Sequence, residues 1–266
     1  IGVDIEDTNG SLKQFQPSPT VGSFFLRSTI PQGLHYDYDV DARQVAGFVN
    51  YENSYDSGWD VSLGLRLESV SYTYDNKMLD GRTNDAGVPC RLGGCRYNRP
   101  ADRNDSFQNI SPKLGLSYAL NDNHDLQIRV QRGFRAPQAT ELYRLQNNQT
   151  VAELESVELD SFELAFKGAG EAWNYSVTAY FMDKDNDIIT NSARENLNQA
   201  HTKHRGIEFA VGYDLTETLS LNTVFNMALH TYENSEISGG IDIKDNIVDT
   251  APKTFGNLRL TWRPLS

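Results

Sequence analysis

The sequence predicts an all-β protein, an antiparallel up-and-down transmembrane β-barrel, of which this chain forms a partial barrel of about ten long strands. Segments of alternating apolar and polar residues recur along the chain, and most exceed the five or six residues usual for soluble strands. The connections between them are alternately very short and long, as in such barrels. No run of 18 apolar residues occurs, which excludes a transmembrane helix but not a barrel, whose closed ladder satisfies the backbone.

Alternation and turn residues place the strands in order along the chain. We expect strands at residues 2–5, 36–51, 59–68, 110–120, 126–131, 161–167, 173–182, 206–213, 219–230 and 255–262. Tight turns rich in Gly, Asn and Asp follow several of them. Long loops are expected at 8–37 (with one embedded segment at 23–26), 75–105, after Arg135, 183–200 and 233–253.

The two faces of the central strands differ in charge. One face carries only apolar residues: Leu63, Leu116, Ile128, Leu164, Val177, Val211 and Phe225. The other carries Arg66, Lys113, Arg129, Glu163 and Glu208. The first face fits lipid and a convex surface, and the second fits a wet, concave lumen. A soluble β-sandwich would show the same alternation, but strand length and turn asymmetry favour an open, curved barrel wall.

Composition narrows the function. Hydrophobic residues make up 38% and aromatic residues 11%, with 13 Tyr, which suits strands that are half apolar with aromatic residues at the membrane interfaces. The net charge of −12 argues against a nucleic-acid partner. The sequence shows no catalytic Ser-His-Asp set, phosphate-binding loop or paired carboxylates, so we expect neither an enzyme nor a cofactor.

Cys90 and Cys95 lie within the longest predicted loop, separated by four residues that include two glycines. We expect a small-loop disulfide formed in an oxidising compartment. Metal binding would need further ligands, and no His lies between Lys77 and Ser106; metal ligands or free thiols are the alternatives.

Other polar groups give weaker signals. His201 and His204 stand three apart in a predicted extended segment, so they face opposite sides and are not expected to form a metal pair. Residues 183–187 read Asp-Lys-Asp-Asn-Asp, but positions 6 and 12 of a calcium loop are occupied by Ile188 and Arg194. We therefore predict no metal site and a solvated acidic loop here.

Several motifs occur in a consistent order. Residues 65–68 read Leu-Arg-Leu-Glu, residues 111–115 read Ser-Pro-Lys-Leu-Gly, and residues 133–137 read Gly-Phe-Arg-Ala-Pro, followed by Glu-Leu-Tyr at 141–143. Residues 206–208 read Gly-Ile-Glu after an Asn at 198. In this order and at this spacing the motifs resemble those of TonB-dependent outer-membrane receptors.

That resemblance implies a bacterial outer-membrane location, with short periplasmic turns and long extracellular loops. Residues 1–266 would form part of the barrel domain, with the plug and the terminal strands absent. The implied function is active uptake of a scarce ligand, such as an iron–siderophore or another chelate, energised through TonB. The implied partners are the extracellular chelate, outer-membrane lipid, and the TonB complex acting through an N-terminal region that this chain lacks. A passive porin or surface-adhesion barrel is the alternative.

The ligand-binding candidates lie in the loops. Arg135 would place a guanidinium at the barrel rim, where it could meet an anionic chelate; bonds to loop carbonyls or to a nearby carboxylate are its alternative role. Tyr97, Arg99 and Arg103 lie in the largest predicted loop and are candidates for ligand contact, or else form ordinary loop surface.

Overall fold

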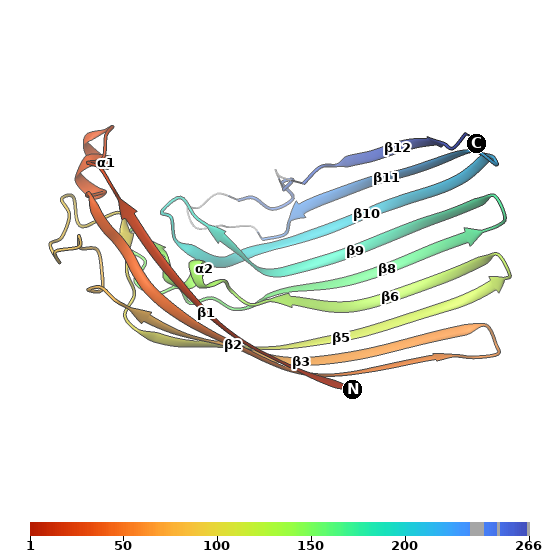
Figure 1. Ribbon diagram of the computed structural model, residues 1–266, viewed down its shortest axis with the longest axis horizontal. Coiled ribbons are helices and arrows are strands. Elements are labelled where there is room, and N and C mark those ends of the chain that lie inside the picture. Colours follow the sequence, from red (N-terminus) through yellow and green to blue (C-terminus); the bar gives the residue numbers. More distant parts are fainter. Residues whose placement is uncertain (235–241, 249–250, 265–266) are drawn as a thin grey trace.

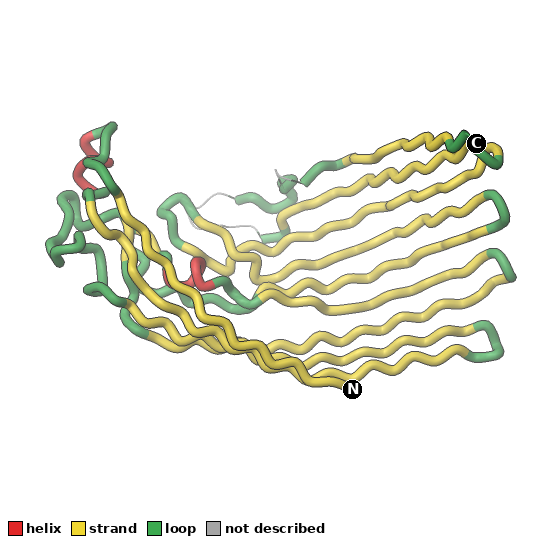
Figure 2. Tube along the Cα trace, in the orientation of Figure 1, coloured by secondary structure: helices red, strands yellow, loops and turns green. Residues whose placement is uncertain are grey.

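A single large antiparallel sheet dominates the computed structural model, which describes residues 1–234, 242–248 and 251–264. Its strand order is β1-β2-β3-β5-β6-β8-β9-β10-β11-β12, so each strand neighbours the next long strand in sequence (Figures 1 and 2). The strands are β1 (Gly2–Gln16), β2 (Gly33–Ser54), β3 (Trp59–Asn76), β5 (Arg103–Asn121), β6 (His124–Arg135), β8 (Val157–Ala169), β9 (Trp173–Thr190), β10 (Asn196–Thr216), β11 (Leu219–Tyr232) and β12 (Thr254–Trp262).

Connections at the two ends of the sheet differ in length. Short turns follow β2, β5, β8 and β10 and gather at one end, whereas longer connections gather at the other (Figure 1). Gly58, with φ of 84°, closes the turn between β2 and β3, where a side chain would be strained. The predicted all-β partial barrel is confirmed.

The outer face is an apolar band that crosses nearly all the strands. Cross-strand register places its members in rows, such as Val61, Leu116, Ile128, Leu164, Ala179, Ile207 and Met227. Large members of the band are exposed, among them Leu63, Leu164, Val211 and Phe225. Towards the short turns the band ends in aromatic residues, including the pairs Trp59–Tyr118 and Trp173–Tyr175. Such a band flanked by aromatic residues is the surface that a barrel presents to lipid.

The inner face is polar and hollow. Lys113, Arg129, Glu163, Thr178 and Glu208 line a groove of about 930 Å³. Their charges are partly paired, since Arg129 Nη1 lies 3.3 Å from Glu163 Oε2. The predicted wet, concave face therefore carries the charged residues that alternation assigned to it.

Two loop predictions were wrong because the strands extend further than their apolar residues. β1 continues to Gln16 and β2 begins at Gly33, so much of the predicted loop at 8–37 is strand. Likewise β9 continues to Thr190 and β10 begins at Asn196, which turns the predicted acidic loop at 183–200 into a hairpin. The extensions of β1 (residues 8–16) and β9 (residues 183–190) lie beyond the apolar band, and their residues do not alternate regularly between apolar and polar, so the sequence pattern gave no strand signal there.

Two short helices lie in the longer connections. α1 (Phe24–Thr29) occupies the segment expected at 23–26, and Ser23 Oγ accepts a hydrogen bond from the backbone N–H of Leu26 at 3.3 Å. α2 (Ala139–Tyr143) follows the Arg-Ala-Pro segment. No helix in the described ranges is long and apolar enough to cross a membrane. Part of the predicted loop at 233–253, namely residues 235–241 and 249–250, lies outside the described residues.

Candidate functional site

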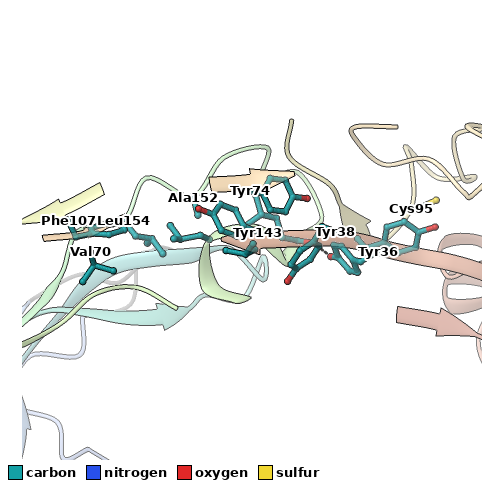
Figure 3. Packing of buried hydrophobic residues seen from close by; sticks show 13 residues of the cluster. Tyr36, Tyr38, Val70, Tyr74, Cys95, Phe107, Tyr143, Ala152 and Leu154 are labelled. Carbon is teal, nitrogen blue, oxygen red and sulfur yellow. Dashed lines mark hydrogen bonds between the residues drawn. The ribbon is translucent and has the colours of Figure 1, made fainter. Parts of the chain in front are cut away.

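A cluster of buried aromatic and aliphatic side chains joins the loops to the inner face at the loop end of the sheet. Tyr36, Tyr38 and Val40 of β2 and Val70 and Tyr74 of β3 form its base. The segment from Leu142 to Leu154, which follows the Arg-Ala-Pro motif, covers this base with its own buried residues (Figure 3). The loop is therefore folded over the wall rather than projecting into solvent.

Tyr143 of α2 fastens this loop. Its ring stacks on Tyr74 with centroids 4.3 Å apart, and its hydroxyl donates to Asp105 Oδ2 at 2.7 Å. Burial, and then the hydrogen bond to Asp105, raise the pKa of the Tyr143 hydroxyl, so the phenol keeps its proton and remains a donor.

A two-stranded ladder links this loop to the largest one. β4 (Tyr97–Asn98) pairs with β7 (Leu145–Gln146), and Asn98 Nδ2 donates to the carbonyl of Gln149 at 2.8 Å. The ladder joins residues almost 50 positions apart in the sequence. It therefore ties the loop between β3 and β5 to the loop between β6 and β8.

Arg99 lies at the centre of the largest loop with 1% of its surface exposed. Its guanidinium donates to the carbonyls of Leu79 (2.6 Å), His35 (3.0 Å) and Thr83 (2.8 Å), and to the Thr83 hydroxyl (2.6 Å). It also lies over the ring of Tyr97, which in turn stacks on His35. Arg99 and Tyr97 therefore hold the loop together.

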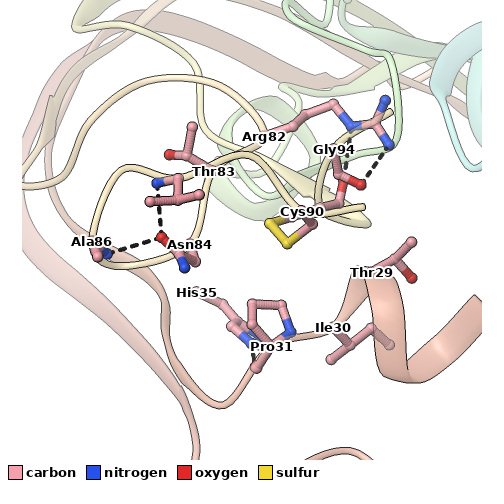
Figure 4. Close-up of a disulfide and its surroundings, with 12 residues drawn as sticks. Thr29, Ile30, Pro31, His35, Arg82, Thr83, Asn84, Ala86, Cys90 and Gly94 are labelled. Atoms are coloured by element: carbon pink, nitrogen blue, oxygen red, sulfur yellow. Dashed lines mark hydrogen bonds between the residues drawn. A yellow bond between two sulfur atoms is a disulfide. The ribbon is translucent and has the colours of Figure 1, made fainter. Parts of the chain in front are cut away.

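The tip of the same loop is closed by a disulfide. Cys90 and Cys95 are joined, with their Cα atoms 4.7 Å apart (Figure 4). Arg82 Nε donates to the carbonyl of Cys95 at 2.7 Å, and the N–H of Arg96 donates to the carbonyl of Thr29 at 2.8 Å. The disulfide thus lies where the loop meets the end of α1.

Arg135 ends β6 and pairs with α2. Its Nη1 and Nη2 lie 2.8 and 3.2 Å from the two carboxylate oxygens of Glu141, a bidentate arrangement. Glu141 also accepts from the N–H of Gln138 at 2.7 Å, which caps α2. The Arg135 side chain stays 41% exposed, so it holds the loop and remains accessible to solvent.

The structure does not bring the four candidate ligand-binding residues into one site. Arg103 is paired with Asp105 within β5 and its side chain is 22% exposed. Arg99 and Tyr97 are buried, so ligand contact by either stays a prediction that their burial does not favour. Of the four, Arg135 offers the most open side chain.

His201 and His204 lie on opposite faces of β10, as the sequence predicted, and each has partners that the sequence did not predict. His201 faces outward, with its ring nitrogens beside the carboxylates of Asp183 and Asp185. His204 faces the groove, and its partner there is His230 of β11, with the two Nδ1 atoms 2.7 Å apart. His230 lies within the predicted strand at 219–230, but only the register between β10 and β11 places it opposite His204.

The family model for TonB dependent receptor-like β-barrels matches residues 4–266. The chain belongs to the TonB-dependent receptor family. Its location is therefore the outer membrane of a Gram-negative bacterium, and the family is one of transport receptors rather than enzymes. No curated protein is significantly similar to the sequence.

Solved receptors share the fold of this chain. The ferric-catecholate import receptor Fiu from E. coli K12 is 14% identical with a TM-score of 0.69, over 98% of this chain and 38% of Fiu. The ferric yersiniabactin uptake receptor FyuA from Yersinia pestis is 12% identical with a TM-score of 0.62, over 86% of this chain and 33% of FyuA. The siderophore receptor PiuA from Acinetobacter baumannii is 13% identical with a TM-score of 0.62, over 88% of this chain and 32% of PiuA. The chain thus matches about a third of the length of these TonB-dependent receptors.

Proposed function

We propose that the chain forms part of the barrel wall of an active transport receptor that takes up a scarce metal chelate, such as an iron–siderophore, with energy supplied through TonB. The observation that carries the proposal is the family match across residues 4–266. Three receptors that share the fold of this chain are a ferric-catecholate import receptor, a ferric yersiniabactin uptake receptor and a siderophore receptor. The remaining wall, the plug and the TonB-contacting region would come from outside this chain.

The arrangement of the chain supports this role. The apolar outer band suits contact with lipid, and the charged groove suits a hydrated path along the inner wall. At the loop end, the disulfide, Arg99 and the Tyr143 contacts pre-organise a folded surface over the wall. Arg135 is the proposed contact for an anionic chelate. Arg99 and Tyr97 would shape the surface, and Arg103 would hold Asp105, the acceptor of the Tyr143 hydroxyl.

Uptake measured with and without TonB tests the proposal. The receptor would be the only uptake route in a Gram-negative host, supplied with ⁵⁵Fe bound to a panel of catecholate and hydroxamate siderophores. We expect accumulation of at least one chelate, abolished when TonB is deleted while binding to the cell surface remains. Entry that continues unchanged without TonB would instead identify a passive porin, and a surface barrel without any uptake would fit adhesion.

A further inference from the structure

Two imidazole rings face each other on the inner wall of the sheet. His204 of β10 and His230 of β11 are register partners, and both line the groove. Their ring centroids are 5.0 Å apart and their Nδ1 atoms 2.7 Å apart. Two nitrogen atoms at this distance cannot both carry a proton, so at least one presents a lone pair to the other.

A buried hydroxyl orients one of the rings. Thr202 is 3% exposed, and its Oγ1 lies 2.9 Å from Nε2 of His204. When this Nε2–H donates to the threonine, Nδ1 of His204 holds the lone pair and points at His230. Metal-binding histidines are commonly oriented in this way, by an outer partner on the nitrogen that does not bind the ion.

A sulfur ligand lies in the same row. Met182 of β9 is the register partner of His204 and also lines the groove. Side chains of directly opposed strand residues project on one face with Cβ atoms about 5 Å apart. Met182, His204 and His230 therefore form a row of one thioether and two imidazoles across three adjacent strands.

We propose that His204, His230 and Met182 bind a copper ion on the inner wall of the barrel. Imidazole and thioether are ligands that favour late transition metals, and among divalent ions the affinity of such sites peaks at Cu²⁺. Two nitrogens that bind one ion at bonds near 2.0 Å in tetrahedral geometry stand about 3.3 Å apart, so small ring rotations open the pair enough. This site does not depend on which chelate the receptor imports.

The surrounding charges permit a cation here. Lys184 lies beside Thr202 in the ladder, but its ammonium group is paired with Asp187 at 2.8 Å. Glu208, four residues from His204 on the same face of β10, lines the same groove and accepts a hydrogen bond from Asn226. The competing metal cluster, Asp183, Asp185 and His201, lies on the opposite face of the same strands.

That opposition supplies a matched control for the experiment. The complete receptor, purified in detergent without a polyhistidine tag, would be titrated with Cu²⁺ and followed by calorimetry and electron paramagnetic resonance. We expect one bound Cu²⁺ with nitrogen hyperfine structure. His204→Gln and His230→Gln should each weaken binding by at least about tenfold, and Thr202→Val by about 10- to 100-fold. His201→Gln, three residues away on the outer face, should bind Cu²⁺ like the parent.

A reduced titration tests the sulfur ligand separately. With Cu⁺ held by a competing chelator, Met182→Leu should bind more weakly than the parent, because thioethers favour Cu⁺. Heat-modifiable migration on gels would verify that each variant has folded. The proposal is overturned if the parent receptor binds no Cu²⁺, if both inner histidine variants bind it unchanged, or if only His201→Gln loses it, which would place the ion on the outer face.

Discussion

At the residue scale, charged side chains in the loops serve mainly to hold backbone. Arg99 is almost wholly buried and donates to the carbonyls of three residues, one in β2 and two in the largest loop, through the rigid planar fork of its guanidinium. Arg135 holds both carboxylate oxygens of Glu141 and so ties β6 to α2. An arginine in a receptor loop is therefore weak evidence for ligand contact until its partners are known.

Replacing Arg99 should unfold its loop without unfolding the barrel. Arg99→Met leaves four buried acceptors without their donor, and we expect a local cost of about 3 kcal/mol or more. Hydrogen exchange of peptides from residues 77–102 in the complete receptor should accelerate by about 100-fold, the same free energy expressed as a rate. Arg91→Met, at an exposed position in the same loop, is the control and should leave exchange unchanged. Equal protection in both variants would show that Arg99 does not hold the loop.

At the element scale, each strand presents one face to lipid and the other to the groove. In the ladder between β8 and β9, Leu164 is opposite Ala179 on the outer face, and Ala165 is opposite Thr178 on the inner face. Leu164 is 38% exposed, which would be unfavourable in water and is favourable in a bilayer. Each strand is therefore stable only when its outer face contacts lipid and its inner face contacts water.

Arginine scanning of one ladder should reveal this asymmetry. Leu164→Arg places a charge in the lipid-facing band, and we expect a loss of about 2 to 4 kcal/mol in folding stability. Thr178→Arg faces the groove and should cost much less, since its charge stays hydrated. Urea unfolding of the complete receptor in lipid vesicles, followed by heat-modifiable migration, gives both values. If Thr178→Arg were the more damaging variant, the two faces would be assigned the wrong way round.

At the scale of the whole molecule, the sheet is curved but not closed. β1 and β12 are the outermost strands of the sheet order, so among the residues that the structure describes each has a ladder partner on one side only. Their free N–H and C=O groups are a template for pairing with another chain, and lipid cannot satisfy them. A barrel wall of this curvature is therefore stable only as part of a larger closed ladder.

The chain expressed by itself should consequently self-associate. Refolded into detergent, residues 1–266 should sediment as a broad distribution of oligomers, because the edges of β1 and β12 pair between copies. The complete receptor under the same conditions should sediment as a single species. A sharp monomeric boundary for the isolated chain would mean that its edges are satisfied internally.

The sequence by itself determined the class of fold and the two faces of the wall. Period-two alternation assigned Leu164 outward and Glu163 inward, because neighbouring residues of a strand point to opposite sides whatever surrounds them. Turn residues such as Gly58 marked one end of the sheet for the same local reason. The Arg-Ala-Pro segment likewise marked the point where β6 ends, since proline interrupts a ladder.

Tertiary structure decided the features that depend on distant partners. Apolar and polar residues no longer alternate where β1 and β9 extend beyond the apolar band. The full length of these strands is therefore defined only by their pairing with β2 and β10. Whether Arg99 is exposed depends on carbonyls up to 64 residues away, and the opposition of His204 and His230 depends on a register between strands. Local sequence carries neither, because register and burial are properties of two segments together rather than of either one alone.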